Sequence, residues 1–419
     1  MLDTLQEIWG AVMRNKLRTA ATGFAVAGGI FLLIVLLGAG NGIIHTLDHN
    51  SEGFALDAVH IYGGYTSMPL EGIKDGRRIR LDARDGDMAE RTFGRTVAAV
   101  SPTVSRSASS IVSGNRSYSN ANLTGAYPEH AKVDRVKILC GRFINDFDIK
   151  EKRKTIIIDE KAEKELFGKG QSAIGKMIKV DNIAYKVVGI SENNFMFGSS
   201  DFYIPFTTLQ TIYGQGCFID ELTLQVRGLD TEEKNDHFVG DYRKATGRLH
   251  SFNPEDKRAI WIWNSASENV SMSMAKNILH TSFWILGLLT LLSGVVGVSN
   301  IMLITVKERT HEFGIRKALG AKPWSIIRMV MLESILITTL FGYIGMVCGV
   351  GFCEYMDATA GNQVMDAGIF QQEYFIDPTV DVRTCIQATL VMVISGAVAG
   401  FIPARKAAKV KPIEALRAN

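Results

Sequence analysis

Charged residues at helical spacing follow one of the apolar stretches of this chain, in the segment 306–321. Glu308 and Glu312 are four residues apart, as are Glu312 and Arg316, so a continuing helix would carry all three on one face, where a Glu–Arg ion pair can form. Gly320 is expected to end this helix, and Pro323 to begin the next one. A solvated basic loop is the simpler interpretation of such charges, but the regular pattern favours a segment that binds another protein.

Gly170, Gly175 and Lys176 have the spacing of a phosphate-binding loop. Such a loop needs Ser or Thr after the lysine to hold magnesium, whereas Met177 stands there. It should also follow a buried strand and open a helix, and here a helix is expected before it and a strand after it. The segment therefore predicts a turn, and we expect the chain to bind no cofactor.

The five cysteines and eight histidines show no spacing typical of a metal site. Cys140 and Cys217 could form a disulfide, although two free thiols are the simpler interpretation. Motifs of hydrolases and paired catalytic carboxylates are not found, so we predict that the chain is not itself an enzyme. The formal net charge is only +3, with basic residues beside apolar stretches, which argues against a nucleic-acid partner.

Four apolar stretches are long enough to cross a bilayer as helices, which takes about 20 residues. They are expected at 20–44, 277–306, 328–354 and 384–403. The first is too long for a cleaved signal peptide and is predicted to be a retained anchor. Glu333 lies near one end of the third stretch and is interpreted as structural. Glycines in the second and third stretches indicate close helix packing, within one chain or across a dimer: Gly287, Gly294, Gly297, Gly342, Gly345, Gly349 and Gly351.

Basic residues near the ends of these stretches predict their orientation, since Lys and Arg stay on the cytoplasmic side. Three clusters agree on one topology: Arg14, Lys16 and Arg18; Lys307, Arg309, Arg316, Lys317, Lys322 and Arg328; and Arg405, Lys406, Lys409, Lys411 and Arg417. Both termini are therefore expected in the cytoplasm, with a cytoplasmic loop at 307–327, a cytoplasmic tail at 404–419 and a short outer loop at 355–383. Residues 1–19 form either an amphipathic helix at the membrane surface or a plain extension of the first span.

Residues 45–276 must then lie outside the cytoplasm, and their composition is typical of an α+β domain. Strands are expected at 155–158, 184–190 and 222–226, helices at 160–167 and 231–246, and loops at 63–80. The predicted fold class is a membrane protein of four transmembrane helices with a large α+β extracytoplasmic domain inserted between helices 1 and 2.

The run 308–321, with the pattern Glu-Arg-x-x-Glu-x-Gly-Ile-Arg-Lys-Ala-Leu-Gly-Ala, resembles the MacB/FtsX-like family of ABC transporter permeases. The segments 403–408 and 412–417 resemble the end of such permeases. Five short segments of the outer domain look like the family's periplasmic core domain: 141–143, 166–168, 174–176, 187–189 and 203–205.

This resemblance implies a multi-pass permease of the bacterial inner membrane that pairs with a second copy of itself or with a homologous permease. A separate ABC ATPase dimer would hold ATP and Mg, and a periplasmic adaptor is a further candidate partner. The contact with the ATPase is assigned to seven residues: Glu308, Arg309, Glu312, Gly314, Arg316, Lys317 and Gly320. The tail residues expected nearby are Arg405, Pro412, Glu414 and Leu416.

The implied function couples ATP hydrolysis in the partner to motion of the outer domain. That motion would export or release a membrane- or periplasm-located substrate, such as a lipoprotein, a peptide or an amphiphilic drug. The alternative is a regulator that transports nothing and switches an external partner such as a cell-wall hydrolase. A receptor or sensor would lack the patterned segment at 308–321.

Overall fold

The computed structural model describes residues 16–51, 55–119, 121–168, 170–192, 200–214, 216–360, 364–366, 371–373 and 376–410. The chain forms two compact units, one made of Met1–Asn50 and Ala275–Asn419 and the other of Ser51–Met274. Most of the predicted amphipathic segment at 1–19 lies outside the described residues.

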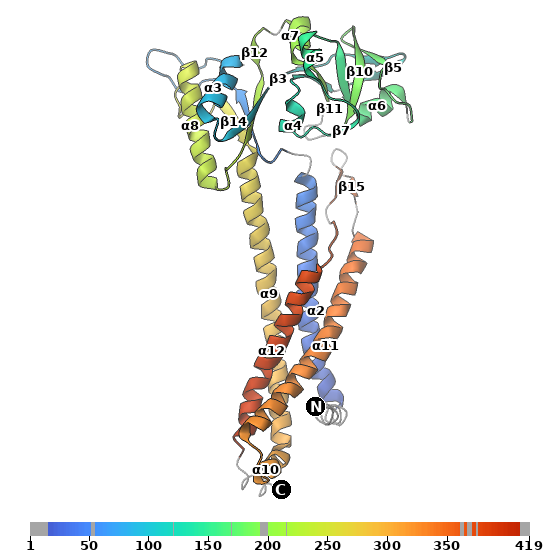
Figure 1. Ribbon diagram of the computed structural model, residues 1–419, viewed down its shortest axis with the longest axis vertical. Coiled ribbons are helices and arrows are strands. Elements are labelled where there is room, and N and C mark those ends of the chain that lie inside the picture. The colour runs from blue at the N-terminus through green and yellow to red at the C-terminus, as the bar shows by residue number, and fades with distance from the viewer. Residues whose placement is uncertain are drawn as a thin grey trace. The chain divides into compact units, whose positions relative to one another are not determined.

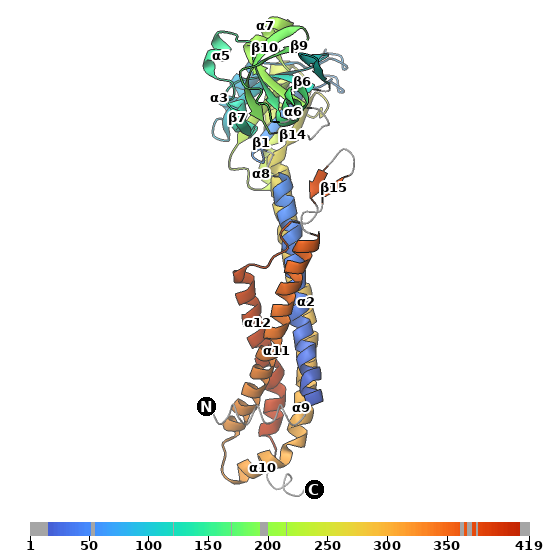
Figure 2. The same cartoon turned by 90° about the vertical axis from the view of Figure 1, so that its right-hand side faces the viewer.

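Four long helices dominate the first unit, and they run side by side in both views (Figures 1 and 2). They are α2 (Lys16–Ser51), α9 (Ser265–Glu308), α11 (Pro323–Ala360) and α12 (Val382–Ala408). Each is long and apolar enough to cross a membrane, as the sequence predicts. A short hairpin of β15 (Val364–Asp366) and β16 (Gln371–Glu373) belongs to the same unit. All four helices extend beyond the predicted spans, because backbone hydrogen bonding continues through polar turns that no apolar pattern marks.

Side chains of these helices separate into an inner core and an exposed apolar surface. Ile30 and Leu33 of α2 and Met392 of α12 are buried in a common core. In contrast, Leu292 of α9 is 56% exposed and Leu340 of α11 is 51% exposed. A water-soluble bundle would not display so much apolar surface, and lipid is the solvent that suits it.

Two glycines allow α2 to approach its neighbours closely. A Cβ atom on Gly294 of α9 would lie 3.0 Å from the carbonyl oxygen of Ala25, and one on Gly345 of α11 would collide with that of Ala27. These two predicted packing positions are therefore used within one chain.

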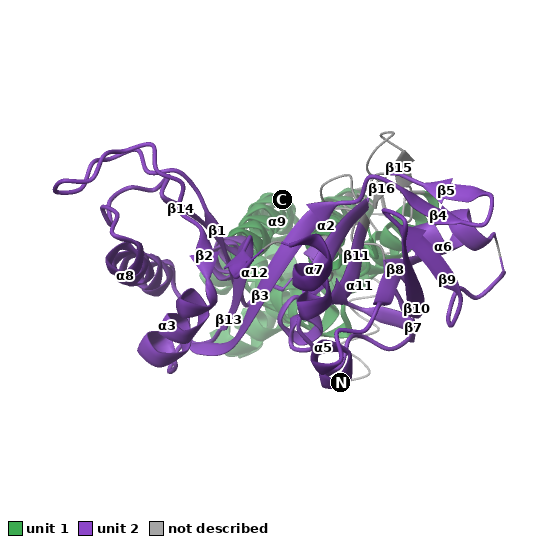
Figure 3. Ribbon diagram, turned by 90° about the horizontal axis from the view of Figure 1, so that it is seen from above, with its two compact units in different colours: residues 1–50, 275–419 green, residues 51–274 purple. Residues whose placement is uncertain are grey.

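The second unit, purple in Figure 3, is built on one mixed sheet in the order β14-β1-β13-β3-β6-β11-β8-β10-β9-β4-β5, with β7 beside β10. Its first half is antiparallel and carries two helices, in the order β1 (Ala58–Gly63), α3 (Ala83–Phe93), β13 (Glu221–Val226), α8 (Glu232–His250) and β14 (Ile260–Asn264). A separate pair is formed by β2 (Leu81–Asp82) and β12 (Phe218–Ile219).

The second half contains the remaining strands and four short helices. The strands are β4 (Ile111–Ser113), β5 (Arg116–Tyr118), β6 (Ala121–Ala126), β7 (Ile138–Gly141), β8 (Thr155–Asp159), β9 (Met177–Val180), β10 (Ile183–Ser191) and β11 (Ser200–Pro205). The helices are α4 (His130–Val133), α5 (Asp146–Lys150), α6 (Glu160–Phe167) and α7 (Phe206–Tyr213). One strand, β3 (Val97–Ser107), belongs to both halves, since its first part pairs with β13 and its last part with β6.

Local patterns locate several of these elements correctly. The strand predicted at 155–158 is β8, the helix at 160–167 is α6, and the helix at 231–246 is most of α8. Residues 64–80 form loops held by isolated bridges such as Tyr65 with Arg78. Gly170 and Gly175, with φ of +83° and +82°, lie between α6 and β9, which is a turn as expected. All five cysteines are free thiols.

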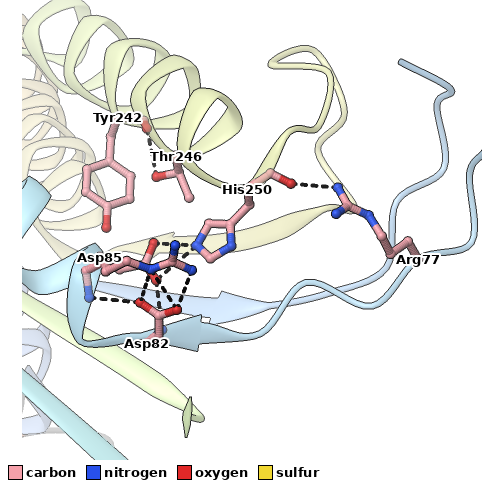
Figure 4. A network of polar contacts seen from close by, with 7 residues as sticks. Arg77, Asp82, Asp85, Tyr242, Thr246 and His250 are labelled. Atoms are coloured by element: carbon pink, nitrogen blue, oxygen red, sulfur yellow. Dashed lines mark hydrogen bonds and ion pairs between the residues drawn. The ribbon is translucent and has the colours of Figure 1, made fainter. Parts of the chain in front are cut away.

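A polar network fixes the end of α8 against the start of α3 (Figure 4). Nε2 of His250 donates to the two carboxylate oxygens of Asp85 at 2.8 and 3.0 Å, and the Asp85 side chain is fully buried. The same carboxylate accepts the backbone N–H of Asp82 in a capping box. Arg77 adds hydrogen bonds to the carbonyls of His250 and Ser251. This network connects residues 77–85 with the end of α8, which is distant from them in sequence.

A second polar pair, between buried His60 and partly buried Glu221, joins β1 to β13. Nδ1 of His60 donates to Oε1 of Glu221 at 2.7 Å, and the Tyr62 hydroxyl donates to the same oxygen at 2.8 Å. Burial lowers the pKa of His60, but the hydrogen bond and charge of Glu221 outweigh it, so the pKa is raised above 6.5. Burial raises the pKa of Glu221, and the bond to His60 outweighs it, so this pKa is lowered below 4.5. The two groups therefore stabilise one another as an ion pair.

We expect His250→Ala to destabilise the contact of α3 with α8 by about 3 kcal/mol, because Asp85 would remain buried without its partner. Hydrogen exchange of the full-length chain should show this loss as faster exchange in the two helices. The control is His237→Ala, since His237 is exposed on the same helix. Unchanged exchange rates of α3 and α8 amides in His250→Ala would mean that the backbone N–H of Asp82 alone is a sufficient partner for the Asp85 carboxylate.

We expect Glu221→Gln to weaken the pairing of β1 with β13 most between pH 4.5 and 6.5. The contribution of His60 is complete below its unfolded pKa and is lost as pH rises through the raised folded value. The contribution of Glu221 is complete above its unfolded pKa and is lost as pH falls through the lowered folded value.

The measurement is exchange of β1 and β13 amides, mutant against wild type at each pH. Exposed Glu90→Gln in α3 is the control. A difference that is equal at low and high pH would contradict the ion pair.

Candidate functional site

A short helix, α10 (Thr310–Ala318), follows α9 after a single intervening residue, Arg309. The expectation of one continuous helix through Glu308, Glu312 and Arg316 is therefore wrong. The hydroxyl of Thr310 donates to the carbonyl of Lys307 at 2.7 Å and lies 3.2 Å from that of Val306. A side chain that satisfies the last carbonyls of α9 stabilises an end at this point.

The other end of α10 agrees with the prediction. Gly320 has a φ of +91°, and its N–H donates to the carbonyl of Lys317 while that of Ala321 donates to Arg316, both at 3.0 Å. This is a Schellman motif, in which the left-handed position favours glycine. Pro323 then begins α11, in the first helical position where its missing N–H costs nothing.

Phe313 anchors α10 in the helix core. Its side chain is 1% exposed and packs in the same cluster as residues of α2, α9, α11 and α12. The guanidinium of Arg309 lies over its ring, 5.5 Å from the centroid. Gly314 beside it is buried as well, so the inner side of α10 has little freedom to move.

Arg309 connects α10 to α11 through two carboxylates. Its Nε donates to Oε2 of Glu312 at 2.9 Å, and its Nη1 donates to Oε2 of Glu333 at 3.1 Å. Glu333 is only 4% exposed. A buried carboxylate needs such a partner, because desolvation of an unpaired charge costs several kcal/mol. Glu333 is thus the structural partner of the junction between α9 and α10.

Lys317 connects α10 to the end of α12. Its Nζ donates to the carbonyls of Ala408 at 2.6 Å and Val410 at 2.9 Å. The last carbonyls of a helix lack partners in the helix itself, and a cation offsets the partial negative charge there. Helix α10 is therefore fixed at both ends, by Arg309 to α11 and by Lys317 to α12.

The side of α10 away from this core is exposed and partly apolar. Leu319 is 83% exposed and Ile315 is 40% exposed, and they are four residues apart. Trp324, at the start of α11, is 71% exposed. Glu308 and Glu312 are exposed too. We use the name outer surface of α10 for four exposed residues: Glu308 at the end of α9, Glu312 and Ile315 in α10, and Leu319 at its C-cap.

Of the seven predicted contact residues, the structure brings together Arg309 and Glu312 near Glu333. Lys317 lies against the end of α12, and Nη1 of Arg316 lies 2.9 Å from Sδ of Met329. Arg405 is exposed on α12. The tail residues Pro412, Glu414 and Leu416 lie outside the described residues. Sequence reasoning missed Phe313, Ile315 and Leu319, although an apolar pair four residues apart beside charged residues was a visible signal.

Two family models match the chain. The MacB-like periplasmic core domain matches residues 19–235, and the FtsX-like permease C-terminal domain matches residues 284–412, which include α10. The chain belongs to the MacB/FtsX-like family of ABC transporter permeases.

Curated relatives of this permease fall into two kinds. It is 27% identical to the macrolide export ATP-binding/permease protein MacB of Chlorobium luteolum over 99% of its own length, but spans only 60% of that protein. It is 25% identical to the uncharacterized ABC transporter permease YknZ of Bacillus subtilis, over 100% of its own length and 99% of that protein.

Two solved structures are similar to about half of this chain. The periplasmic region of MacB from Actinobacillus actinomycetemcomitans is 20% identical, with a TM-score of 0.42, and the match covers 54% of this chain and 96% of that one. The extracellular domain of YknZ from Gram-positive bacteria is 18% identical, with a TM-score of 0.40, and the match covers 49% and 100%.

In this permease, we expect Arg309→Gln to lower the free energy of local unfolding of α10 by about 3 kcal/mol. The reason is that Glu333 would remain buried after losing its cationic partner. Amide exchange across α10 in the full-length chain measures the effect. Exposed Arg328→Gln is the matched control. The double variant Arg309→Gln/Glu333→Gln should recover part of the loss, since neither charge then remains unpaired. If the free-energy loss in the double variant equals the sum of the losses in Arg309→Gln and Glu333→Gln, the result would contradict the pairing.

Proposed function

We propose that this chain is the permease subunit of an ABC transporter, in which a separate ATPase subunit drives motion of the α+β domain through α10. The observation that carries the proposal is the two-sided character of α10. Its inner side is fixed by Phe313, Arg309 and Lys317, while Ile315 and Leu319 on its other side are exposed apolar side chains. A force on the outer surface would pass directly to α11 and α12.

The charge distribution supports a cytoplasmic position for α10. Lys307, Lys322 and Arg328 surround it and are exposed. Basic residues near span ends stay in the cytoplasm, so both termini would lie there as well. The α+β domain, which follows the first span, would then lie outside the cytoplasm.

A partner is required on energetic grounds. A ligand shifts a protein between two conformations only if it binds them with different affinity. ATP and Mg would be held by the ATPase subunit. Its ATP-bound and nucleotide-free states would bind the outer surface of α10 with different affinity. One relative, YknZ, is a permease by name, which supports a separate ATPase chain.

The ATPase would act as a dimer beneath two permeases, either two copies of this chain or this chain with a homologous one. The cargo would be a lipoprotein, a peptide or an amphiphilic drug in the membrane or at its outer face. The names of the MacB relatives, which specify macrolide export, support export over a purely regulatory role. A periplasmic adaptor is a further proposed partner.

We expect the tagged chain, purified from its native membranes in mild detergent, to bring an ABC ATPase subunit with it. Leu319→Asp should reduce the recovered ATPase about tenfold, because a charge replaces an apolar side chain at the interface, a loss of about 1.4 kcal/mol or more. Glu308→Lys/Glu312→Lys should reduce it as well. Met177→Asp, an exposed apolar position in the α+β domain, is the control.

The recovered complex is then assayed for ATP hydrolysis. If wild type brings no ATPase, the permease proposal fails and a receptor role becomes the better one. If Leu319→Asp recovers as much ATPase as wild type, α10 is not the contact. ATP hydrolysis that no candidate cargo stimulates would favour the regulatory alternative.

A further inference from the structure

A groove of about 370 Å³ lies between the end of α9 and the end of α12, apart from the outer surface of α10. On the α9 side it is lined by Leu303, Ile304 and Lys307, and on the α12 side by Lys406 and Val410. Its walls are thus apolar, with one lysine on each side.

The side chains of the two lysines, Lys307 and Lys406, are the distinctive polar groups of this groove. Both side chains are exposed, and neither ammonium is paired with a carboxylate in the described part of the chain. Lysine near a helix end is common, because it offsets the partial charge of the last carbonyls. That ordinary role explains each lysine alone, but it does not explain why the two lie on opposite sides of one apolar groove.

Exposed apolar side chains lead along α12 to one of these lysines. Ile394, Val398 and Ile402 are 53%, 56% and 54% exposed, and with Lys406 they follow one another at intervals of four residues. Residues four apart share one helix face. This face of α12 is therefore an exposed apolar stripe that ends in a cation.

Helix α9 has a similar arrangement. Val296 is 54% exposed and Ile304 is 49% exposed, on a line that Asn300 interrupts, and Lys307 follows Ile304 by three residues. Two apolar stripes thus end in two lysines with a groove between them. This matches the two parts of a membrane lipid, whose acyl chains need apolar contact and whose phosphate needs cations at the membrane boundary.

We propose that the groove between α9 and α12 binds one anionic phospholipid, with its phosphate between Lys307 and Lys406 and an acyl chain against Ile304. Thr310 also lines the groove, and its hydroxyl donates a hydrogen bond to the carbonyl of Lys307. A bound lipid would therefore lie directly beside the break between α9 and α10. The lipid site does not depend on the proposed function. In the proposed orientation, the bound lipid would belong to the cytoplasmic leaflet, and only this last point rests on that orientation.

Native mass spectrometry of the full-length chain in neutral detergent tests the site. The probes are phosphatidylglycerol and phosphatidylcholine with the same acyl chains. Wild type should retain phosphatidylglycerol in preference to phosphatidylcholine. Lys307→Gln/Lys406→Gln should retain about thirtyfold less phosphatidylglycerol, which is the change expected from two lysines at about 1 kcal/mol each.

Lys322→Gln/Lys409→Gln is the matched control, because it removes two exposed lysines, one just before α11 and one at the end of α12, that do not line the groove. Lys307→Arg/Lys406→Arg should keep the lipid, and it provides a test if the glutamine variant does not fold. Equal retention of both lipids by wild type, or equal retention by the glutamine variant and its control, would overturn the proposal.

Inorganic phosphate added in excess distinguishes a lipid from a soluble anion. It should leave the bound phosphatidylglycerol in place, because phosphate makes no contact with the apolar walls. Displacement by phosphate alone would show a soluble-anion site, or a position for an acidic side chain of a partner, and would also overturn the proposal.

Discussion

The buried carboxylate of Glu333 places the strongest constraint on the membrane-spanning unit. An unpaired charge at this position would cost several kcal/mol, so the fold must bring a cation to it. Arg309 meets the need because α9 ends at Glu308 and α10 begins at Thr310, which leaves Arg309 at the break between them. This pairing connects the break between α9 and α10 to α11, and the same guanidinium lies over the ring of the buried Phe313.

The contacts of α10 divide between two kinds of neighbour. Those to α11 and α12 are internal, specific and mostly charged, and they include backbone carbonyls that would otherwise lack partners. The outer surface is open and mixes carboxylates with Ile315 and Leu319. An element that transmits force between proteins needs this combination, since a loose inner side would absorb the displacement that the outer side receives.

Local patterns in the sequence predicted the local parts of this structure. Apolar length located the four spans, and Gly320 and Pro323 marked the boundary between α10 and α11. The pairing of Arg309 with Glu333 joins residues 24 apart, and that of Lys317 with Ala408 joins residues 91 apart. No spacing rule reaches such contacts, and the same holds for β3, which pairs with β6, the strand close after it, and with β13, which follows much later in the chain. The assignment of individual residues to an ATPase contact remains a prediction.

The sharing of β3 between the two halves of the α+β domain also limits how that domain can be divided. Val97 to Thr103 pair with β13, and pairing with β6 starts at the very next residue, Val104. No unpaired backbone is left between the two ladders to act as a hinge. Either half alone would present a long unpaired strand edge, which is a template for aggregation. Both halves of the domain are therefore expected to fold together and to move as a single piece.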